Sequence, residues 1–351
     1  MKANTDKRPK LLIIYTGGTI GMIENPDTRT LEPFDFDHLM DNVPKLKMLD
    51  FDIDNFQFSE PIDSSMMNPA HWGDIARVIE EHYDAYDGFV VLHGTDTMAY
   101  TASALSFMLE NLDKPVIITG SQLPIGEVRT DGEENLIAAL QVAAARDCKG
   151  NAKVREVAIL FQNYLLRGNR STKYSADNFD AFRSDNYAPL ATIGLGITFN
   201  CDALSHRPTP NGPLKVHYNM NTDIAELGLF PGISETVVRH ILALPNIKGL
   251  VLRTFGAGNG PCDPWFLDAI RQTVKRGVVL VNITQCNNGA VIPTRYETGA
   301  KLASSGLIAG HDMTTEAAIT KLMYLLGCNL TPTEIAKEME TSLRGELTEE
   351  S

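Results

Sequence analysis

The chain has 351 residues, 43% of them hydrophobic, which is enough to build about two domains with separate cores. It carries 31 basic and 44 acidic residues, and the net charge of −13 would repel both the phosphate backbone of nucleic acids and anionic membrane surfaces. The 5 cysteines are scattered and form no CxxC pair, which argues against a disulfide framework and against a zinc site. The apolar run after the basic N-terminus is too short for a secretion signal, and no stretch reaches the ~18 apolar residues of a membrane span. We therefore expect a cytoplasmic protein with neither nucleic acid nor membrane as a partner.

Short apolar runs with helical segments between them predict the fold class. The runs are at 11–15, 89–92, 116–119, 157–161, 249–252 and 278–283. Continuous apolar strands of this kind are buried on both faces, as in parallel sheets. We predict helices that begin after Asp131, with Glu134 completing a capping box, and at Pro264 and Pro332. Strands that alternate with helices indicate an α/β protein.

Residues 198–221 hold several prolines and show no sustained period, so a domain boundary is expected there. We predict a larger N-terminal α/β domain with a mainly parallel sheet at 1–205, a linker at 206–222, and a smaller C-terminal α/β domain at 223–351. A short strand is possible at 214–218. The polar segment 342–351 is expected to fray.

Two of the apolar runs open onto loops of glycine and threonine. TGGTIG contains Thr19, and HGTDT contains Thr95 and Asp96. Ligands bind outside the carboxyl ends of parallel strands, so the two loops are expected to meet over one substrate. TGGTIG lacks both the GxGxxG spacing and the lysine of a phosphate-binding loop, which argues against a nucleotide-binding site. A threonine hydroxyl needs a nearby base before it can act as a nucleophile, and Asp96 offers a carboxylate.

Each of these residues also has a purely structural reading. Taken alone, Asp96 fits a turn residue or the N-cap of the helix that follows it. His93 fits a packed or backbone-bonded histidine better than a catalytic base, and it has no neighbours at metal-ligand spacing. The polar loops GSQLP, QNYLLRGN, FGAGNG and TQCNNG, which follow other strands, also suit ordinary turns.

The motifs YTGGTIGM, IDSSMM, HGTDTMAYTASAL, GSQLP, STKYSADNFDAF, FGAGNG and TQCNNG together resemble bacterial L-asparaginases of the cytoplasmic type I branch. The resemblance covers about residues 10–330. It implies hydrolysis of L-asparagine to L-aspartate and ammonia without metal or cofactor, through a β-aspartyl ester. It also implies that Thr19 is the nucleophile, and that Thr95, Asp96 and Lys173 form a proton relay.

The resemblance further implies a substrate-binding loop and a subunit interface. Asp96 would pair with the substrate α-ammonium group, and Ser64 would hold the α-carboxylate, with Ser65 next to it and Asp63 in support. Asn259 matches a residue that family members contribute to a neighbouring subunit's site. This implies at least a dimer, and the family is usually a tetramer built from two such dimers.

Some type I members bind a second asparagine as an activator, and Thr172, Arg253 and Cys286 match positions linked to that effector site. All three could equally be scaffold, and matching residues do not establish a coupling free energy. The sequence also departs from the family: no tyrosine follows Thr19 where a lid tyrosine is common, so either Thr30 or another residue replaces it or the lid works differently. Met66 stands where an aspartate often follows the serine pair.

Two alternatives remain open. One is the glutamine-hydrolysing subunit of a tRNA amidotransferase, which resembles the same family but normally carries an added N-terminal domain. The other is a catalytically silent amino-acid sensor. Retention of both threonines, the aspartate and the lysine favours the enzyme.

Overall fold

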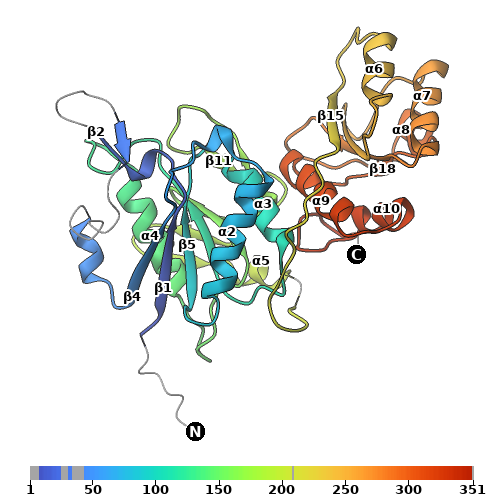
Figure 1. Cartoon of the computed structure of the whole chain (residues 1–351). Helices are drawn as coiled ribbons and strands as arrows, with labels where there is room; N and C mark the ends of the chain where they lie inside the picture. Colours follow the sequence, from blue (N-terminus) through green and yellow to red (C-terminus); the bar gives the residue numbers. More distant parts are fainter. Residues whose placement is uncertain (1–7, 25–30, 34–42, 208, 350–351) are drawn as a thin grey trace. The chain divides into compact units, whose positions relative to one another are not determined.

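The computed structural model describes residues 8–24, 31–33, 43–207 and 209–349. The chain forms two compact units, Met1–Tyr218 and Asn219–Ser351. The division falls inside the segment that we expect to be a linker, whose exact extent stays a prediction. Figure 1 shows the two units and the labels used below.

The N-terminal unit is built on an eight-stranded sheet with the order β13-β12-β9-β8-β7-β5-β1-β4. Strands β4, β1, β5, β7 and β8 run parallel, whereas β9, β12 and β13 are joined by antiparallel pairing. The strand bounds are β1 Lys10–Tyr15, β4 Asp52–Gln57, β5 Gly88–Leu92, β7 Val116–Thr119, β8 Val157–Phe161, β9 Tyr164–Arg167, β12 Ala191–Ile193 and β13 Ile197–Phe199. The parallel strands therefore end at one common edge, where β1 and β5 are direct neighbours.

Helices cover both faces of this sheet. Helix α4 (Gly132–Ala144) packs on the face that carries Leu11, Ile13 and Val90, while α2 (Pro69–His82) and α3 (Met98–Met108) lie on the opposite face (Figure 1). The remaining elements of the unit are η1 Thr19–Gly21, β2 Met22–Glu24, β3 Leu31–Pro33, η3 Pro44–Met48, η4 Ser64–Met66, β6 Leu109–Glu110, η5 Gly168–Arg170, β10 Thr172–Lys173, β11 Phe182–Arg183, α5 Cys201–Ser205 and β14 Lys215–Val216.

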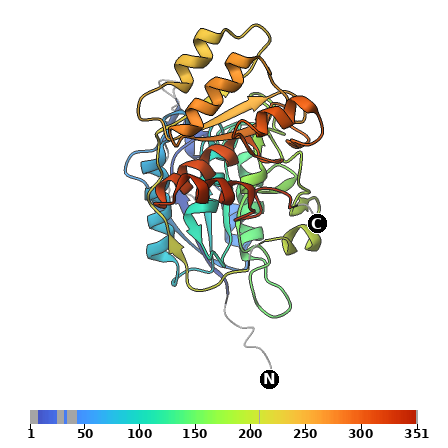
Figure 2. The same cartoon turned by 90° about the vertical axis from the view of Figure 1, so that its right-hand side faces the viewer.

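The C-terminal unit is a smaller version of the same design. Its four strands, in the order β15-β16-β17-β18, are all parallel. Their bounds are β15 Ile224–Gly228, β16 Gly249–Thr254, β17 Val279–Thr284 and β18 Ile308–Ala309, and the helices are α6 Glu235–Leu242, α7 Pro264–Lys275, α8 Glu297–Ala303, α9 Thr315–Gly327 and α10 Pro332–Glu340. Helices α6 and α7 lie on one side of this sheet, and α9 and α10 on the other (Figures 1 and 2). The predicted fold class is thus confirmed.

The helix starts show which capping predictions were right. Thr331 caps α10 with Pro332 at the first helical position, as the sequence indicates, and Glu334 adds a capping box that was not predicted. Asp131 precedes α4 but makes no capping bond, because its carboxylate instead accepts the backbone N–H groups of Gln122 and Leu123. The N-cap reading of Asp96 was also wrong, since Thr97 occupies the N-cap position of α3.

Residues 342–349 of the polar C-terminal segment are fixed in place, contrary to our expectation of fraying. Glu346 is completely buried and forms an ion pair of 2.6 Å with the equally buried Lys321 of α9. The Lys321 ammonium group also donates to the carbonyl of Thr341, and Asp312 accepts the backbone N–H of Thr348. The segment is therefore held by polar contacts to residues distant in sequence, which composition alone does not reveal.

Candidate active site

The loop that carries Thr19 is held by close backbone packing. It begins where β1 ends, and the first two of its three glycines adopt positive φ angles, 135° at Gly17 and 90° at Gly18. A Cβ on Gly17 would lie 2.3 Å from the carbonyl oxygen of Ile62, and one on Gly18 would lie 2.4 Å from the backbone nitrogen of Gly94. Only glycine fits both the φ angles and these approaches. The loop is thereby placed against both other loops that hold predicted site residues.

Beneath this loop, the Tyr15 hydroxyl donates a hydrogen bond of 3.1 Å to the carbonyl oxygen of Gly21. Burial raises the pKa of Tyr15 to about 12, so the phenol stays protonated and remains a donor at neutral pH. Thr19 itself is partly exposed, and no hydrogen bond to its hydroxyl occurs within the described part of the chain. The hydroxyl is therefore presented at the surface of the site. Thr30, named above as a possible lid residue, lies outside the described residues.

The predicted relay residues meet in space. The Lys173 ammonium group donates to Thr95 Oγ1 at 2.9 Å and to Asp96 Oδ1 at 2.6 Å. The lysine side chain is 17% exposed and the aspartate 64%, so the lysine is held inside while the carboxylate faces solvent. Lys173 lies on β10, whereas Thr95 and Asp96 follow β5. The fold thus brings together residues almost 80 positions apart.

Gln122 is a further hydrogen-bond partner of Thr95 that was not predicted from the sequence. The Thr95 hydroxyl donates to Gln122 Oε1 at 3.4 Å, and Gln122 Nε2 donates to the carbonyl oxygen of Asn178 at 2.9 Å. The backbone N–H of Gln122 is itself held by the Asp131 carboxylate at 3.0 Å. Since Lys173 can only donate, the Thr95 hydroxyl accepts from the lysine and directs its own proton toward Gln122. The sequence feature that could have indicated Gln122 was the polar GSQLP motif directly after β7.

The predicted substrate-binding loop lies beside the second threonine loop. Asp63 accepts the backbone N–H of Ser65 at 2.8 Å, and this bond lowers the pKa of the Asp63 carboxyl. Thr97 Oγ1 donates to the carbonyl oxygen of Ser64 at 2.7 Å. A Cβ on Gly94 would lie 2.5 Å from Ser64 Oγ, which shows how closely the two loops pack. Ser64 is buried and Ser65 is exposed.

The remaining predicted site residues are distributed over both units. Thr172 lies on β10 of the N-terminal unit, whereas Arg253 and Cys286 lie in the C-terminal unit. Arg253 forms an ion pair of 3.2 Å with Glu226, and the exposed Cys286 donates its backbone N–H to Thr284 Oγ1. Asn259 accepts the Thr298 hydroxyl at 2.8 Å. Their predicted roles remain untested by these contacts.

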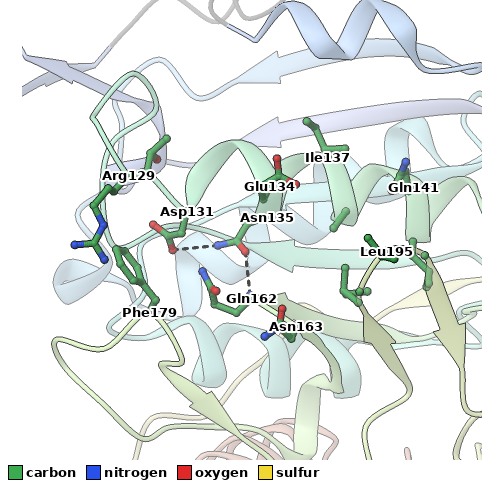
Figure 3. A pocket seen from close by; sticks show the side chains of 16 residues that line it. Arg129, Asp131, Glu134, Asn135, Ile137, Gln141, Gln162, Asn163, Phe179 and Leu195 are labelled. Atoms are coloured by element: carbon green, nitrogen blue, oxygen red, sulfur yellow. Dashed lines mark hydrogen bonds between the residues drawn. The ribbon is translucent and has the colours of Figure 1, made fainter.

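A separate pocket of about 710 Å³ is lined by none of the predicted site residues. Figure 3 shows the Asp131 carboxylate bonded to the Asn135 amide, whose oxygen in turn accepts the backbone N–H of Gln162. Asp131 lines this pocket and also holds the backbone of Gln122. The Asp131 carboxylate thus belongs to the pocket wall and also holds the residue that accepts the Thr95 hydroxyl.

Two other kinds of feature are absent from the described residues. Among the described residues, no group of three or more His, Cys, Asp or Glu side chains is placed to hold a metal ion. Within the same residues, no helix is long and apolar enough to cross a membrane.

Comparison with known proteins identifies the family. An asparaginase N-terminal domain model matches residues 10–204, and a glutaminase/asparaginase C-terminal domain model matches residues 223–339. The L-asparaginase 1 of Escherichia coli K12 is 46% identical, covering 97% of this chain and 99% of that protein. The human 60 kDa lysophospholipase is 44% identical, and here the match covers 97% of this chain but 61% of that protein. The crystal structure of L-asparaginase I from Vibrio cholerae superposes with a TM-score of 0.88 at 43% identity, over 97% of this chain and 99% of that one. With two domain models matched in order and relatives aligned along almost its whole length, the chain belongs to the asparaginase family.

Proposed function

We propose that the protein hydrolyses L-asparagine to L-aspartate and ammonia, with Thr19 as the nucleophile. The observation that carries this proposal is the double contact of the Lys173 ammonium group with Thr95 Oγ1 and Asp96 Oδ1, beside the loop that presents Thr19. The similarity to asparaginases over the whole chain supports the same substrate.

Substrate binding would use the charged head of the amino acid. The Asp96 carboxylate, 64% exposed, pairs with the α-ammonium group. Ser64 and Ser65 hold the α-carboxylate, and the bond from Ser65 to Asp63 fixes the shape of that loop. Holding both charged groups places the side-chain amide carbon near the Thr19 hydroxyl and converts a collision into an oriented reaction. One extra methylene would misplace that carbon, so glutamine should react more slowly.

In the first step, Thr19 Oγ1 attacks the amide carbon and its proton passes to Thr95 Oγ1, while Thr95 passes its own proton to the Lys173 amine and Lys173 passes one to the Asp96 carboxylate. The carbonyl oxygen then carries a negative charge that backbone N–H groups of the threonine loops can stabilise. Cleavage of the C–N bond, with a proton delivered to the nitrogen, releases ammonia and leaves a β-aspartyl ester on Thr19. Water then attacks this ester, which frees L-aspartate and restores the threonine hydroxyl.

We further propose that the chain works in the cytoplasm as a dimer or tetramer, with Asn259 contributing to a neighbouring subunit's site. Its cysteines form no disulfide among the described residues, which suits a reducing compartment. Activation by a second asparagine, through Thr172, Arg253 and Cys286, is part of this proposal and rests on matching positions alone.

The decisive experiment measures ammonia release by the purified protein from L-asparagine and, in parallel, from L-glutamine. We expect turnover of asparagine with little turnover of glutamine. Thr19→Ala should abolish the release of ammonia from asparagine while the melting curve is unchanged. Thr19→Ser, which keeps a hydroxyl, serves as the matched control variant. If glutamine were the better substrate, the protein would instead be interpreted as the glutamine-hydrolysing subunit of a tRNA amidotransferase. If neither substrate were turned over, a silent sensor would remain.

The same assay over a range of asparagine concentrations tests the effector site. A sigmoidal curve that becomes hyperbolic in Arg253→Ala or Thr172→Ala would support it, whereas a hyperbolic curve in the wild type would count against it. Light scattering of the purified protein would determine whether it is a dimer, a tetramer or a monomer.

A further inference from the structure

His93, the last residue before the glycine of the second threonine loop, lies at the centre of a buried chain of hydrogen bonds. Its side chain is completely buried. Nδ1 lies 2.6 Å from the carbonyl oxygen of Gly94, and Nε2 lies 2.9 Å from the hydroxyl of Thr101 on α3. The indole N–H of Trp72, on α2, donates to the same hydroxyl at 3.0 Å. Two helices on one face of the sheet are thereby connected to the loop that holds Thr95 and Asp96.

The partners fix the direction of every bond in this chain. The Gly94 carbonyl can only accept, so Nδ1 carries the hydrogen. The indole N–H can only donate, so the Thr101 oxygen accepts it and the Thr101 hydrogen points to Nε2. Burial lowers the pKa of His93 to about 4, so the ring is neutral at physiological pH and this single tautomer persists.

The hydrogen bond from His93 to the Gly94 carbonyl orients the whole peptide unit between Gly94 and Thr95. Because the peptide unit is planar and trans, a carbonyl that points toward the His93 ring directs the N–H of the following residue, Thr95, the opposite way. The structure shows no hydrogen-bond partner for the Thr95 N–H among the residues it describes. Gly94 itself is confined between Gly18 and Ser64. The Thr95 N–H is therefore held, unpaired, on the side away from the core.

We propose that His93 is a positioning residue for hydrolysis: its Nδ1–H fixes the Gly94–Thr95 peptide so that the Thr95 N–H is aimed at the oxygen that becomes negatively charged in the transition state. This rests on the function proposed above and adds to it a residue that does not touch the substrate. The requirement is for a donor at the position of Nδ1, not for a titrating base.

Two amide variants separate this role from simple packing. In His93→Asn the side-chain amide can place its N–H where Nδ1 stood, which keeps the bond to Gly94 and loses the bond to Thr101. In His93→Gln the amide reaches the position of Nε2 instead, which keeps Thr101 and loses Gly94. Each variant breaks one buried hydrogen bond, so both should lower the melting temperature by similar amounts.

We expect kcat for asparagine in His93→Gln to fall about 10- to 100-fold with KM changed less than about threefold, since the affected group acts on charge that develops only in the transition state. In His93→Asn, kcat should remain within about threefold of the wild type. Equal kcat values in the two variants, or an effect of His93→Gln on KM alone, would overturn the positioning role while leaving the asparaginase activity intact. Absence of ammonia release by the wild type would instead overturn the proposed function, and this inference with it.

Discussion

Mild acid should destabilise the N-terminal unit through His93, and the size of the effect follows from its surroundings. The pKa of an unfolded histidine is 6.5, whereas burial lowers that of His93 to about 4. Between these values the unfolded chain binds a proton that the folded chain does not, so the free energy of unfolding falls as the pH falls. Above pH 6.5 the residue contributes no pH dependence.

The full window of about 2.5 pH units, at about 1.4 kcal/mol per unit, corresponds to a loss of about 3 kcal/mol by pH 4. Between pH 7 and pH 5 the loss should be about 2 kcal/mol. No charged side chain contributes to this pKa, whose causes are burial and the bond to the Gly94 carbonyl. Salt should therefore leave the effect almost unchanged.

Urea unfolding followed by tryptophan fluorescence measures this loss directly. The chain has 2 tryptophans, so Trp265→Phe leaves Trp72, which is buried in the N-terminal unit next to the His93 network, as the single reporter. The control is His93→Asn in the same background, which removes the titrating group and keeps the carboxylates that titrate at lower pH. We expect the unfolding free energy of the control to vary by less than about 0.5 kcal/mol over pH 7 to 5. If both proteins lost the same free energy over that range, the assignment of acid sensitivity to His93 would be refuted.

Three further outcomes follow from the contacts described above. Lys321→Met should lower the stability of the C-terminal unit by about 3–5 kcal/mol, because it leaves the carboxylate of Glu346 buried and unpaired; adding Glu346→Gln, which removes that charge, should recover much of the loss in thermal unfolding. Gly94→Ala should abolish ammonia release and lower the melting temperature through its clash with Ser64, and Ser64→Gly in the same chain should restore the melting temperature but not the activity. Gln122→Ala should lower kcat about tenfold in the same assay without unfolding the protein, since it removes the acceptor of the Thr95 hydroxyl; an unchanged kcat would show that this bond has no part in the reaction.

Much of the scaffold could be predicted because its signals are local. Each of the six predicted apolar runs coincides with an observed strand, and Thr331 and Pro332 occupy the predicted N-cap and first helical positions of α10. The three relay residues could be named because the motifs around them resemble a known family, although no pattern in the residues themselves indicated that Lys173 would reach Asp96. That contact depends on where β10 lies relative to β5, which is a property of the whole fold.

The errors share one cause, which is competition between local and distant partners for the same polar group. Asp131 has the sequence context of an N-cap, yet its carboxylate binds the backbone of Gln122. The polar composition of the C-terminal segment predicts that Glu346 is solvated, yet this residue forms a buried ion pair with Lys321. In both cases a carboxylate satisfies a buried or partly buried donor outside its own helical turn, and leaving such a donor unpaired is costly enough to outweigh local preference. Gln122 was missed for the same reason, since its partners lie in three different segments.

The two threonine loops look alike in sequence but are held by different forces. The Thr19 loop is fixed by glycines whose φ angles and backbone approaches exclude any side chain, and its threonine hydroxyl makes no hydrogen bond within the described residues. The Thr95 loop is fixed by polar contacts, from Lys173 on one side and from His93 beneath. Substitutions of Gly17 or Gly18 should therefore act through sterics and be insensitive to which polar group is introduced, whereas substitutions of Lys173 or His93 should depend on donor position. The proposed hydrolysis needs both arrangements, because a Thr19 nucleophile must be able to bond to the substrate while the groups proposed to move its proton must already be in place.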